Sequence, residues 1–221
     1  MLDTAFPRPL GDAGNTDSYD CPARLKIVKD AGSLEIVKNG RPTDELVENF
    51  CTAAQELEAE GAGAIVSTCG FLMTIQEQIA GAVTIPVMVS SLSLHPVIRA
   101  VMGEGKIGIL TASKNALGAT VLGTAKIRPT DVAIKGLEDC LAFSEAILTE
   151  KKNQRSTMDV ETIEQAVLQK ASELVSENPG LTAILLECGN LPPYAAAIEK
   201  STGLPVFSIL DGARLIWRKN E

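Results

Sequence analysis

The stretch AIVSTCG at residues 64–70 recurs 119 residues later as AILLECG at residues 183–189. The match continues without a gap on both sides, where Glu58, Gly61, Pro86 and Val87 recur as Glu177, Gly180, Pro205 and Val206. Each copy has the pattern of a helix, a glycine turn and a continuous apolar run that ends at a cysteine. Such a run is typical of a strand buried on both faces of a parallel sheet. The repeat therefore predicts two similar halves, each with a cysteine at a strand end.

The rest of the chain alternates short apolar runs with longer amphipathic segments. Helices are predicted at 43–60, 74–82, 95–102, 114–125, 137–148, 157–177, 194–201 and 211–218, and strands at 25–29, 63–68, 86–90, 106–111, 132–136, 182–187 and 205–208. This alternation is typical of parallel α/β folds. We predict two pseudosymmetric lobes, each a small parallel sheet flanked by helices, with the active site in the cleft between them.

The repeat divides the chain into lobes at residues 1–103 and 104–221, and we expect the C-terminal helix to pack back on the first lobe. The first lobe needs a strand equivalent to residues 106–111, but only residues 1–4 occupy that place. Its first strand is therefore very short, or the natural chain begins before Met1.

Composition excludes several classes of protein. A net charge of −8 argues against a nucleic-acid partner. The most apolar stretch, residues 79–94, is interrupted by Pro86 and three serines, so we expect no membrane span. One histidine and no C-x-x-C pair argue against a metal site. An odd number of cysteines, five, and an N-terminus without a signal-peptide pattern favour free thiols in a reducing, cytoplasmic location.

Cys69 and Cys188 are the candidate catalytic residues. Ligands of open parallel sheets bind at the carboxyl ends of the strands, where both cysteines lie. One thiol as thiolate can remove a proton from a carbon, and the other can deliver a proton to the opposite face. Free cysteines are often inert small hydrophobic residues, and we assign that role to Cys21, Cys51 and Cys140. The occurrence of two cysteines at matched positions of a repeat favours a catalytic role for them over an inert one.

Residues beside the cysteines and at neighbouring strand ends are candidates for substrate binding. Hydroxyls at strand ends often cap the next helix instead, and an aromatic side chain after a strand is often part of the core. Arginine binds carboxylates in bidentate fashion, although a loop arginine is commonly only a surface residue. The candidates are Arg8, Thr68, Gly70, Phe71, Ser90, Ser91, Thr111, Ala112, Gly189 and Asn190. Glu187 is predicted either to act on the pKa of a cysteine at the cleft or to cap a backbone turn.

The motifs STCGF at 67–71, LECGNLPPY at 186–194, LDTAFPRPLGD at 2–12 and IGILTA at 107–112 resemble the aspartate/glutamate racemase superfamily. That superfamily includes cofactor-independent amino-acid racemases, hydantoin racemases, arylmalonate decarboxylases and maleate isomerases. The resemblance implies a two-lobed fold with one cysteine per lobe, no cofactor and a homodimer. The amino-acid racemases commonly have Cys-Asn-Thr and Gly-Cys-Thr around the two cysteines, where this chain has Cys69-Gly70-Phe71 and Glu187-Cys188-Gly189.

The resemblance predicts an isomerase, a cofactor-independent racemase of an aspartate- or glutamate-like amino acid or a close derivative. Its substrate would be a small carboxylate, and Cys69 and Cys188 would transfer the proton at Cα. The alternatives are a hydantoin racemase, an arylmalonate decarboxylase-like enzyme or a maleate isomerase-like enzyme on the same fold. A two-lobed protein that binds a small molecule without catalysis is a further alternative, which the matched thiols disfavour.

Overall fold

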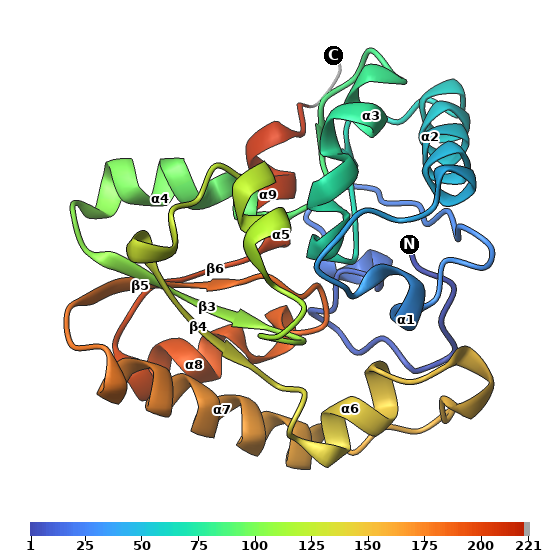
Figure 1. Cartoon of the computed structure of the whole chain (residues 1–221). Coiled ribbons are helices and arrows are strands. Elements are labelled where there is room, and N and C mark those ends of the chain that lie inside the picture. Colours follow the sequence, from blue (N-terminus) through green and yellow to red (C-terminus); the bar gives the residue numbers. More distant parts are fainter. Residues whose placement is uncertain (219–221) are drawn as a thin grey trace.

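Two parallel sheets form the centre of the molecule in the computed structural model, which describes residues 1–218 (Figure 1). The smaller sheet pairs β1 (Ile65–Val66) with β2 (Val87–Met88). The larger sheet has the order β4-β3-β5-β6, formed by β4 (Val132–Gly136), β3 (Lys106–Thr111), β5 (Leu181–Leu186) and β6 (Val206–Phe207). The predicted α/β class, with two small parallel sheets flanked by helices, is confirmed. The lobe boundary at residues 103 and 104 stays a prediction.

The larger sheet is buried between helices on its two sides. In Figure 1, α4 (His95–Met102) lies on one side, and α7 (Val160–Glu177) and α8 (Ala195–Thr202) lie on the other. Strands β3 and β5 form its centre in parallel register, so their apolar side chains are removed from water on both faces. Helix α7 turns one apolar stripe inward, formed by Ile163, Val167, Ala171 and Leu174.

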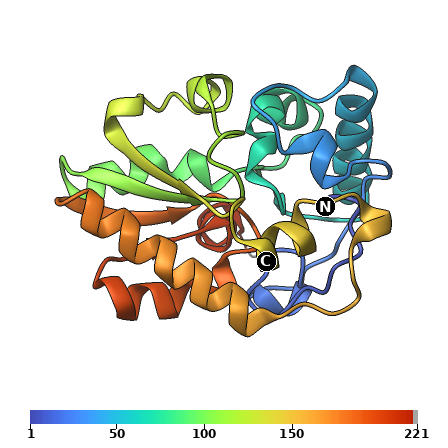
Figure 2. The ribbon, with the colours of Figure 1, turned by 60° about the horizontal axis from the view of Figure 1, so that its bottom comes forward.

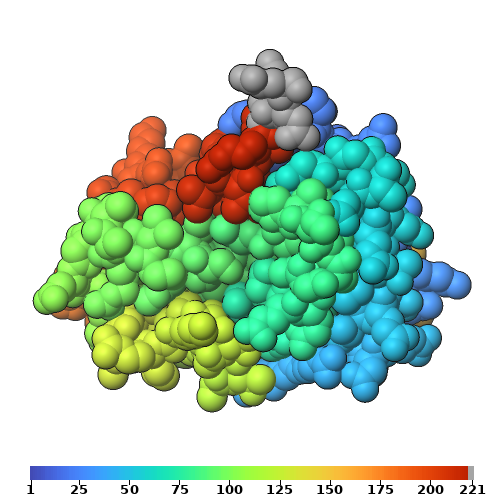
Figure 3. Space-filling view, turned by 90° about the horizontal axis from the view of Figure 1, so that it is seen from above, coloured from blue at the N-terminus to red at the C-terminus, as the bar shows by residue number. Residues whose placement is uncertain are grey.

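The smaller sheet packs against α3 (Gln76–Gly81) and α9 (Ile209–Ile216), and α2 (Asp44–Ala59) packs against α3. Helix α2 begins where the Thr43 side chain accepts a hydrogen bond from the Leu46 N–H. Helix α9 contacts both β1 and β2, and Figure 3 shows the C-terminal segment next to the segment around residues 75–105. A capping box of Ser208 and Asp211 begins α9.

The repeat has a matched backbone feature in its two glycines. Gly61 and Gly180 have φ angles of +90° and +93° at the turns before β1 and β5. Residues with a Cβ rarely adopt this left-handed backbone conformation, whereas glycine does so readily. The recurrence of these glycines in the sequence therefore reflects the same turn in each half.

Several predicted elements differ from the structure. In place of a first strand, Leu2 forms only an isolated parallel bridge with Val28. The helix predicted at 114–125 is shortened to α5 (Ala119–Thr124), which begins after Gly118. The residues before it form a turn in which Ser113 accepts hydrogen bonds from the backbone N–H groups of Ala116 and Leu117. Helix α6 (Leu141–Ile147) starts later than predicted, and α1 (Ser33–Ile36) was not predicted. Short 3-10 turns occupy Thr16–Ser18, Gly70–Ile75, Ser91–Leu94, Pro129–Asp131, Lys151–Asn153 and Pro192–Tyr194.

The N-terminal loop joins the two halves. Its Ala13 N–H donates to the Gly189 carbonyl at 2.9 Å, directly beside the second cysteine. The Ala5 N–H donates to Gln154 Oε1 at 2.7 Å, and Figure 2 shows the segment after α6 running to the N-terminal part of the chain. Within residues 1–218, none of the helices combines the length and apolar character needed to cross a membrane.

Candidate active site

Cys69 and Cys188 come together at the junction of the two sheets. Cys69 follows β1 and precedes the turn Gly70–Ile75, and Cys188 follows β5. Their backbones form an isolated antiparallel bridge, and both residues are buried. Both line one cavity with an empty volume of about 350 Å³, part of which is open to solvent.

Most of the predicted binding residues lie around this cavity. Its lining includes the predicted Arg8, Thr68, Gly70, Phe71, Ala112 and Asn190. Sequence reasoning did not find the apolar walls, which are formed by Leu2, Phe6, Val37, Ile147 and Leu148. These residues come from the N-terminal loop, from the end of α1 and from the end of α6, where no repeat or motif marks them.

Four predicted binding residues are not among the lining residues. The Ser90 hydroxyl accepts from the Leu92 N–H at 3.2 Å, and the Ser91 hydroxyl donates to the Leu186 carbonyl at 2.7 Å. Thr111 donates to Glu187 Oε2 at 2.7 Å. The backbone of Gly189 packs so closely on Thr68 that an added Cβ would overlap the Thr68 carbonyl. The three hydroxyls thus hold together the segments around the cavity, which we call the frame of the site.

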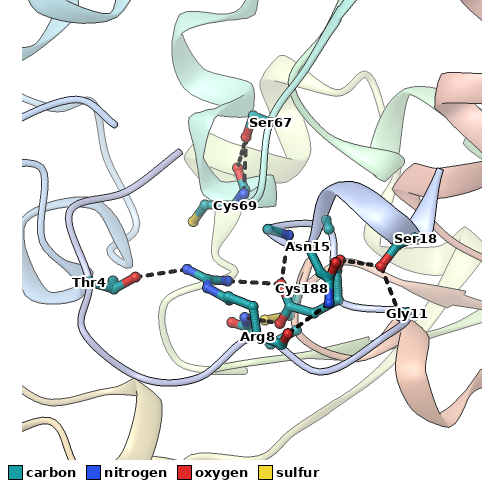
Figure 4. A network of polar contacts seen from close by, with 12 residues as sticks. Thr4, Arg8, Gly11, Asn15, Ser18, Ser67, Cys69 and Cys188 are labelled. Carbon is teal, nitrogen blue, oxygen red and sulfur yellow. Dashed lines mark hydrogen bonds and ion pairs between the residues drawn. The ribbon is translucent and has the colours of Figure 1, made fainter. Parts of the chain in front are cut away.

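The Cys69 backbone is fixed by the serine two positions before it. Ser67 Oγ accepts from the Cys69 N–H at 3.0 Å and donates to the Cys69 carbonyl at 2.9 Å (Figure 4). Burial raises the pKa of the Cys69 thiol to about 12, and the charge of Glu187 contributes to this rise. The backbone N–H of Phe71 and the Arg8 guanidinium act in the opposite direction on that pKa. Cys69 therefore has groups close by that favour its thiolate.

Cys188 is connected to a chain of polar side chains. Its thiol donates to Asn190 Oδ1 at 3.4 Å, and Asn190 Nδ2 donates to Asp12 Oδ2 at 2.7 Å. The other Asp12 oxygen, Oδ1, accepts from Arg8 Nη1 at 3.1 Å. Burial raises the pKa of the Cys188 thiol well above its usual value, and the charges of Glu187, Cys69 and Asp12 add to the effect. The backbone N–H of Asn190 acts in the opposite direction, as that of Phe71 does for Cys69, and the balance of these effects favours the neutral Cys188 thiol.

Arg8 carries the positive charge of the cavity. Its Nη2 donates to Thr4 Oγ1 at 2.8 Å, and its guanidinium carbon lies 4.2 Å from the centroid of the Phe6 ring. Figure 4 shows the side chain extended between Thr4 and the Cys188 motif. The ion pair with Asp12 is almost fully buried, since the exposed fractions of the two side chains are 12% and 2%. A buried pair of this kind holds the guanidinium in one orientation.

Glu187 is the buried carboxyl of the cavity. Oε2 accepts from the Thr111 hydroxyl, and Oε1 has no hydrogen-bond partner within the described residues. The side chain packs on Gly70 so closely that a Cβ there would overlap Oε1. Burial raises the pKa of Glu187 to about 7, against the lowering effect of Thr111. Of the two roles predicted from sequence, the structure shows the one at the cavity, where its charge raises the pKa of both thiols.

Together these groups suit proton transfer at a carbon next to a carboxylate. The cavity offers two thiols, one guanidinium and one carboxyl among largely apolar walls. Low polarity strengthens the interactions of the few charges inside such a site. Across residues 1–218, no group of three or more His, Cys, Asp or Glu side chains is positioned to hold a metal ion.

The fold is similar to that of solved arylmalonate decarboxylase and racemase structures, which is the fold that the sequence motifs predicted. The sulfate-associated Gly74Cys mutant of arylmalonate decarboxylase covers all of this chain with a TM-score of 0.60, at 17% identity and over 94% of its own length. Allantoin racemase from Klebsiella pneumoniae has a TM-score of 0.52 at 15% identity, covering 77% of this chain and 66% of its own. At these identities the likeness concerns the fold alone. No family model matches the sequence.

Sequence relatives place the chain in one family within that fold. The chain is 32% identical over 219 residues to dimethylsulfoniopropionate lyase from Durusdinium sp. clade D, covering 96% of this chain and 70% of the relative. Dimethylsulfoniopropionate lyase 3 from Emiliania huxleyi (strain CCMP1516) is 29% identical over 216 residues, covering 93% of this chain and 55% of the relative. The chain belongs to the dimethylsulfoniopropionate lyase family. It spans little more than half of the Emiliania protein.

The family membership corrects the function predicted from sequence. The protein is an enzyme, but the prediction of an isomerase that racemises an amino acid is wrong, because relatives over more than nine-tenths of the chain are lyases. The physical reason is that removal of a proton from a carbon next to a carboxylate begins racemisation and elimination alike. Two thiols at matched strand ends therefore do not distinguish these reactions. The homodimer and the cytoplasmic location stay predictions.

Proposed function

We propose that this protein cleaves dimethylsulfoniopropionate into dimethyl sulfide and acrylate. The observation that carries the proposal is that Cys69, Cys188 and Arg8 share one small buried cavity in a chain of the lyase family. The substrate is a short zwitterion with a carboxylate at one end and a sulfonium at the other. Only two carbons separate the carboxylate from the sulfonium, so a small cavity with one guanidinium suits this substrate.

Arg8 is the proposed anchor for the substrate carboxylate. Asp12 and Thr4 each receive one of its N–H groups, and a guanidinium has five. The remaining donors are available for a second carboxylate, in the planar geometry that arginine prefers. Binding there would place the carbon next to the carboxylate near the cysteines, since Arg8 acts on the pKa of the Cys69 thiol.

One thiolate then removes a proton from the carbon next to the carboxylate. The electron pair of that C–H bond forms the C=C bond of acrylate, and the bond between the other carbon and sulfur breaks. The sulfur takes the electrons of that bond and leaves as neutral dimethyl sulfide. The products are a thiol, acrylate and dimethyl sulfide: the negative charge of the thiolate is cancelled by the positive charge of the sulfonium, and the carboxylate keeps its own charge in acrylate. No external oxidant or water is consumed.

The two cysteines are unequal candidates for the base. A backbone N–H favours each thiolate, but Arg8 also favours that of Cys69, whereas the Cys188 thiol donates a hydrogen bond to Asn190 Oδ1 and its pKa is raised by Asp12. We therefore assign the role of base to Cys69. Elimination needs only one base, so the second thiol is free to orient the substrate or the base. The apolar walls limit the contact of the substrate with water, which would otherwise compete for the proton.

Product analysis by proton NMR tests the proposal. Purified protein and dimethylsulfoniopropionate at neutral pH should give vinyl signals of acrylate that grow in step with loss of substrate. A headspace measurement of dimethyl sulfide should give an equal amount. Loss of substrate without acrylate, or no loss above a blank that holds boiled protein, would refute the proposed reaction.

A further inference from the structure

Glu187 has a feature that the elimination above does not use. It is a buried carboxyl at the wall of the cavity, and Oε1 has no partner among the described residues. Native structures leave few buried polar atoms unpaired, and an unpaired buried carboxylate oxygen is costly. Such an atom beside a ligand cavity indicates a partner that arrives with the ligand.

We propose that Glu187 provides the counter-charge for the cationic end of the substrate and so selects short zwitterions with an onium group over neutral molecules of the same shape. This inference rests on the proposed function and deepens it. Glu187 is assigned a role in specificity, not in removing the proton.

The distribution of charge in the cavity supports this role. Arg8 and Glu187 are the only Arg, Lys, Asp or Glu residues among the described lining residues. The charge of Arg8 is balanced by Asp12, which also accepts hydrogen bonds from Gly14 and Asn190. Among residues 1–218, the Glu187 carboxyl forms no ion pair, and it accepts a hydrogen bond from the neutral hydroxyl of Thr111. A carboxylate and an onium group in one ligand would complement this arrangement.

The position of Glu187 would also bring the cationic end of the substrate close to the two cysteines. Its side chain packs on Gly70, next to Cys69, and it immediately precedes Cys188 in the chain. Its charge raises the pKa of both thiols, whereas the charge of Arg8 lowers the pKa of Cys69. A bound cation would offset the charge of Glu187 and lower the pKa of the thiol that acts as base.

The alternative is that Glu187 only supports the frame, through its bond to Thr111 at the ends of β3 and β5. A frame role would affect cationic and neutral ligands equally. A counter-charge affects the cationic ligand alone. The ratio of the two affinities therefore separates the roles.

The experiment compares two unreactive ligands of nearly equal shape. One is 3-(trimethylammonio)propionate, which carries an onium group, and the other is 4,4-dimethylpentanoate, in which carbon replaces the nitrogen. Calorimetry with the wild type should show tighter binding of the onium ligand. In Glu187→Gln, the preference should fall about tenfold, which corresponds to about 1.4 kcal/mol, with the affinity for the neutral ligand little changed. Glu45→Gln, an exposed change on α2, is the matched control and should keep the wild-type ratio.

A second variant tests the same idea without removing the carboxyl. Thr111→Val keeps the shape but removes the donor that lowers the pKa of Glu187. The preference for the onium ligand should fall at pH 7 and recover at pH 9, where the carboxyl is ionised again. An unchanged ratio of affinities in both variants would overturn the inference.

The two proposals fail separately. Wild-type protein that prefers the onium ligand through Glu187 but releases no dimethyl sulfide would refute the proposed reaction and retain the specificity role. Protein that cleaves dimethylsulfoniopropionate, with the same ligand ratio in wild type and Glu187→Gln, would refute the role of Glu187 and retain the reaction.

Discussion

The two cysteine motifs occupy equivalent positions but differ in what surrounds them. Cys69 is held through its backbone by Ser67, and the positive charge of Arg8 lowers the pKa of its thiol. Cys188 donates to Asn190, which leads to Asp12. The difference arises because the N-terminal loop packs on the second motif, through Ala13 and Gly189. An internal repeat thus sets where the thiols lie, and a segment outside the repeat makes them unequal.

Removing either thiol is the strongest way to test this inequality. The two variants to compare are Cys69→Ala and Cys188→Ala. The variant that lacks the base should lower kcat for dimethylsulfoniopropionate cleavage by about 10²–10⁴-fold, as is usual for general bases. Because one base suffices, the two losses should differ, with the larger loss for the base. Steady-state kinetics would measure both. Cys51→Ala, outside the cavity, is the matched control, and equal, small losses in the two cavity variants would contradict the account.

Glu187 should make the stability of the protein depend on pH. Its pKa is raised by burial from 4.5 to about 7. The folded protein thus binds this proton more tightly than the unfolded chain does, so the free energy of unfolding falls as pH rises from about 4.5 to about 7. The fall due to this group is roughly 3 kcal/mol. Urea unfolding of wild type and Glu187→Gln at pH 4 and pH 8 would measure it.

Glu187→Gln, which does not titrate, should gain stability relative to the wild type between pH 4 and pH 8. The same difference between the two proteins at both pH values would show that Glu187 is not held in a dry environment.

Arg8 tests the link between the loop and the first motif. Arg8→Lys keeps the charge but loses the planar fork, and we expect kcat/KM to fall about 30-fold, since hydrogen bonds to charged groups are worth about 2 kcal/mol. The loss should be mostly a rise in KM, if Arg8 binds the carboxylate of the free substrate. Arg41→Lys, on an exposed ion pair, is the control. A change in kcat alone would argue against Arg8 as the anchor.

Asn190 tests the side-chain network of the second motif, and its effect should be the smallest. Asn190→Ala removes the acceptor of the Cys188 thiol and one of the donors to Asp12, whereas Arg8 and Gly14 remain. We expect kcat to fall about fivefold, consistent with about 1 kcal/mol for one hydrogen bond. Asn115→Ala, at an exposed site, should have no effect. An Asn190→Ala loss as large as that of Cys188→Ala would mean that Asn190 takes part directly.

Much of the fold followed from the sequence because the repeat carries strong local signals. Continuous apolar runs, matched glycines with positive φ and cysteines at strand ends leave few other arrangements. The residues 1–32 were harder, because this segment is rich in Pro, Gly and Asp and has no periodicity. Its contacts, such as the bridge of Leu2 with Val28, depend on the folded whole.

The site was predictable in its cysteines and less so in its polar partners. A hydroxyl at a strand end can face a ligand or bond to the frame, and the sequence does not distinguish these; Ser91 and Thr111 bond to the frame. The depth of Glu187 depends on the absence of a side chain at Gly70, far away in the sequence. The reaction was mispredicted because the initial proton removal is common to racemases and lyases.

Reversible blocking of the thiols tests the central claim most directly. Methyl methanethiolsulfonate caps cysteines as mixed disulfides, and dithiothreitol removes the cap. Release of dimethyl sulfide from dimethylsulfoniopropionate should stop when mass spectrometry finds Cys69 or Cys188 capped, and should return on reduction. Undiminished release from protein in which both Cys69 and Cys188 are fully capped would contradict the account.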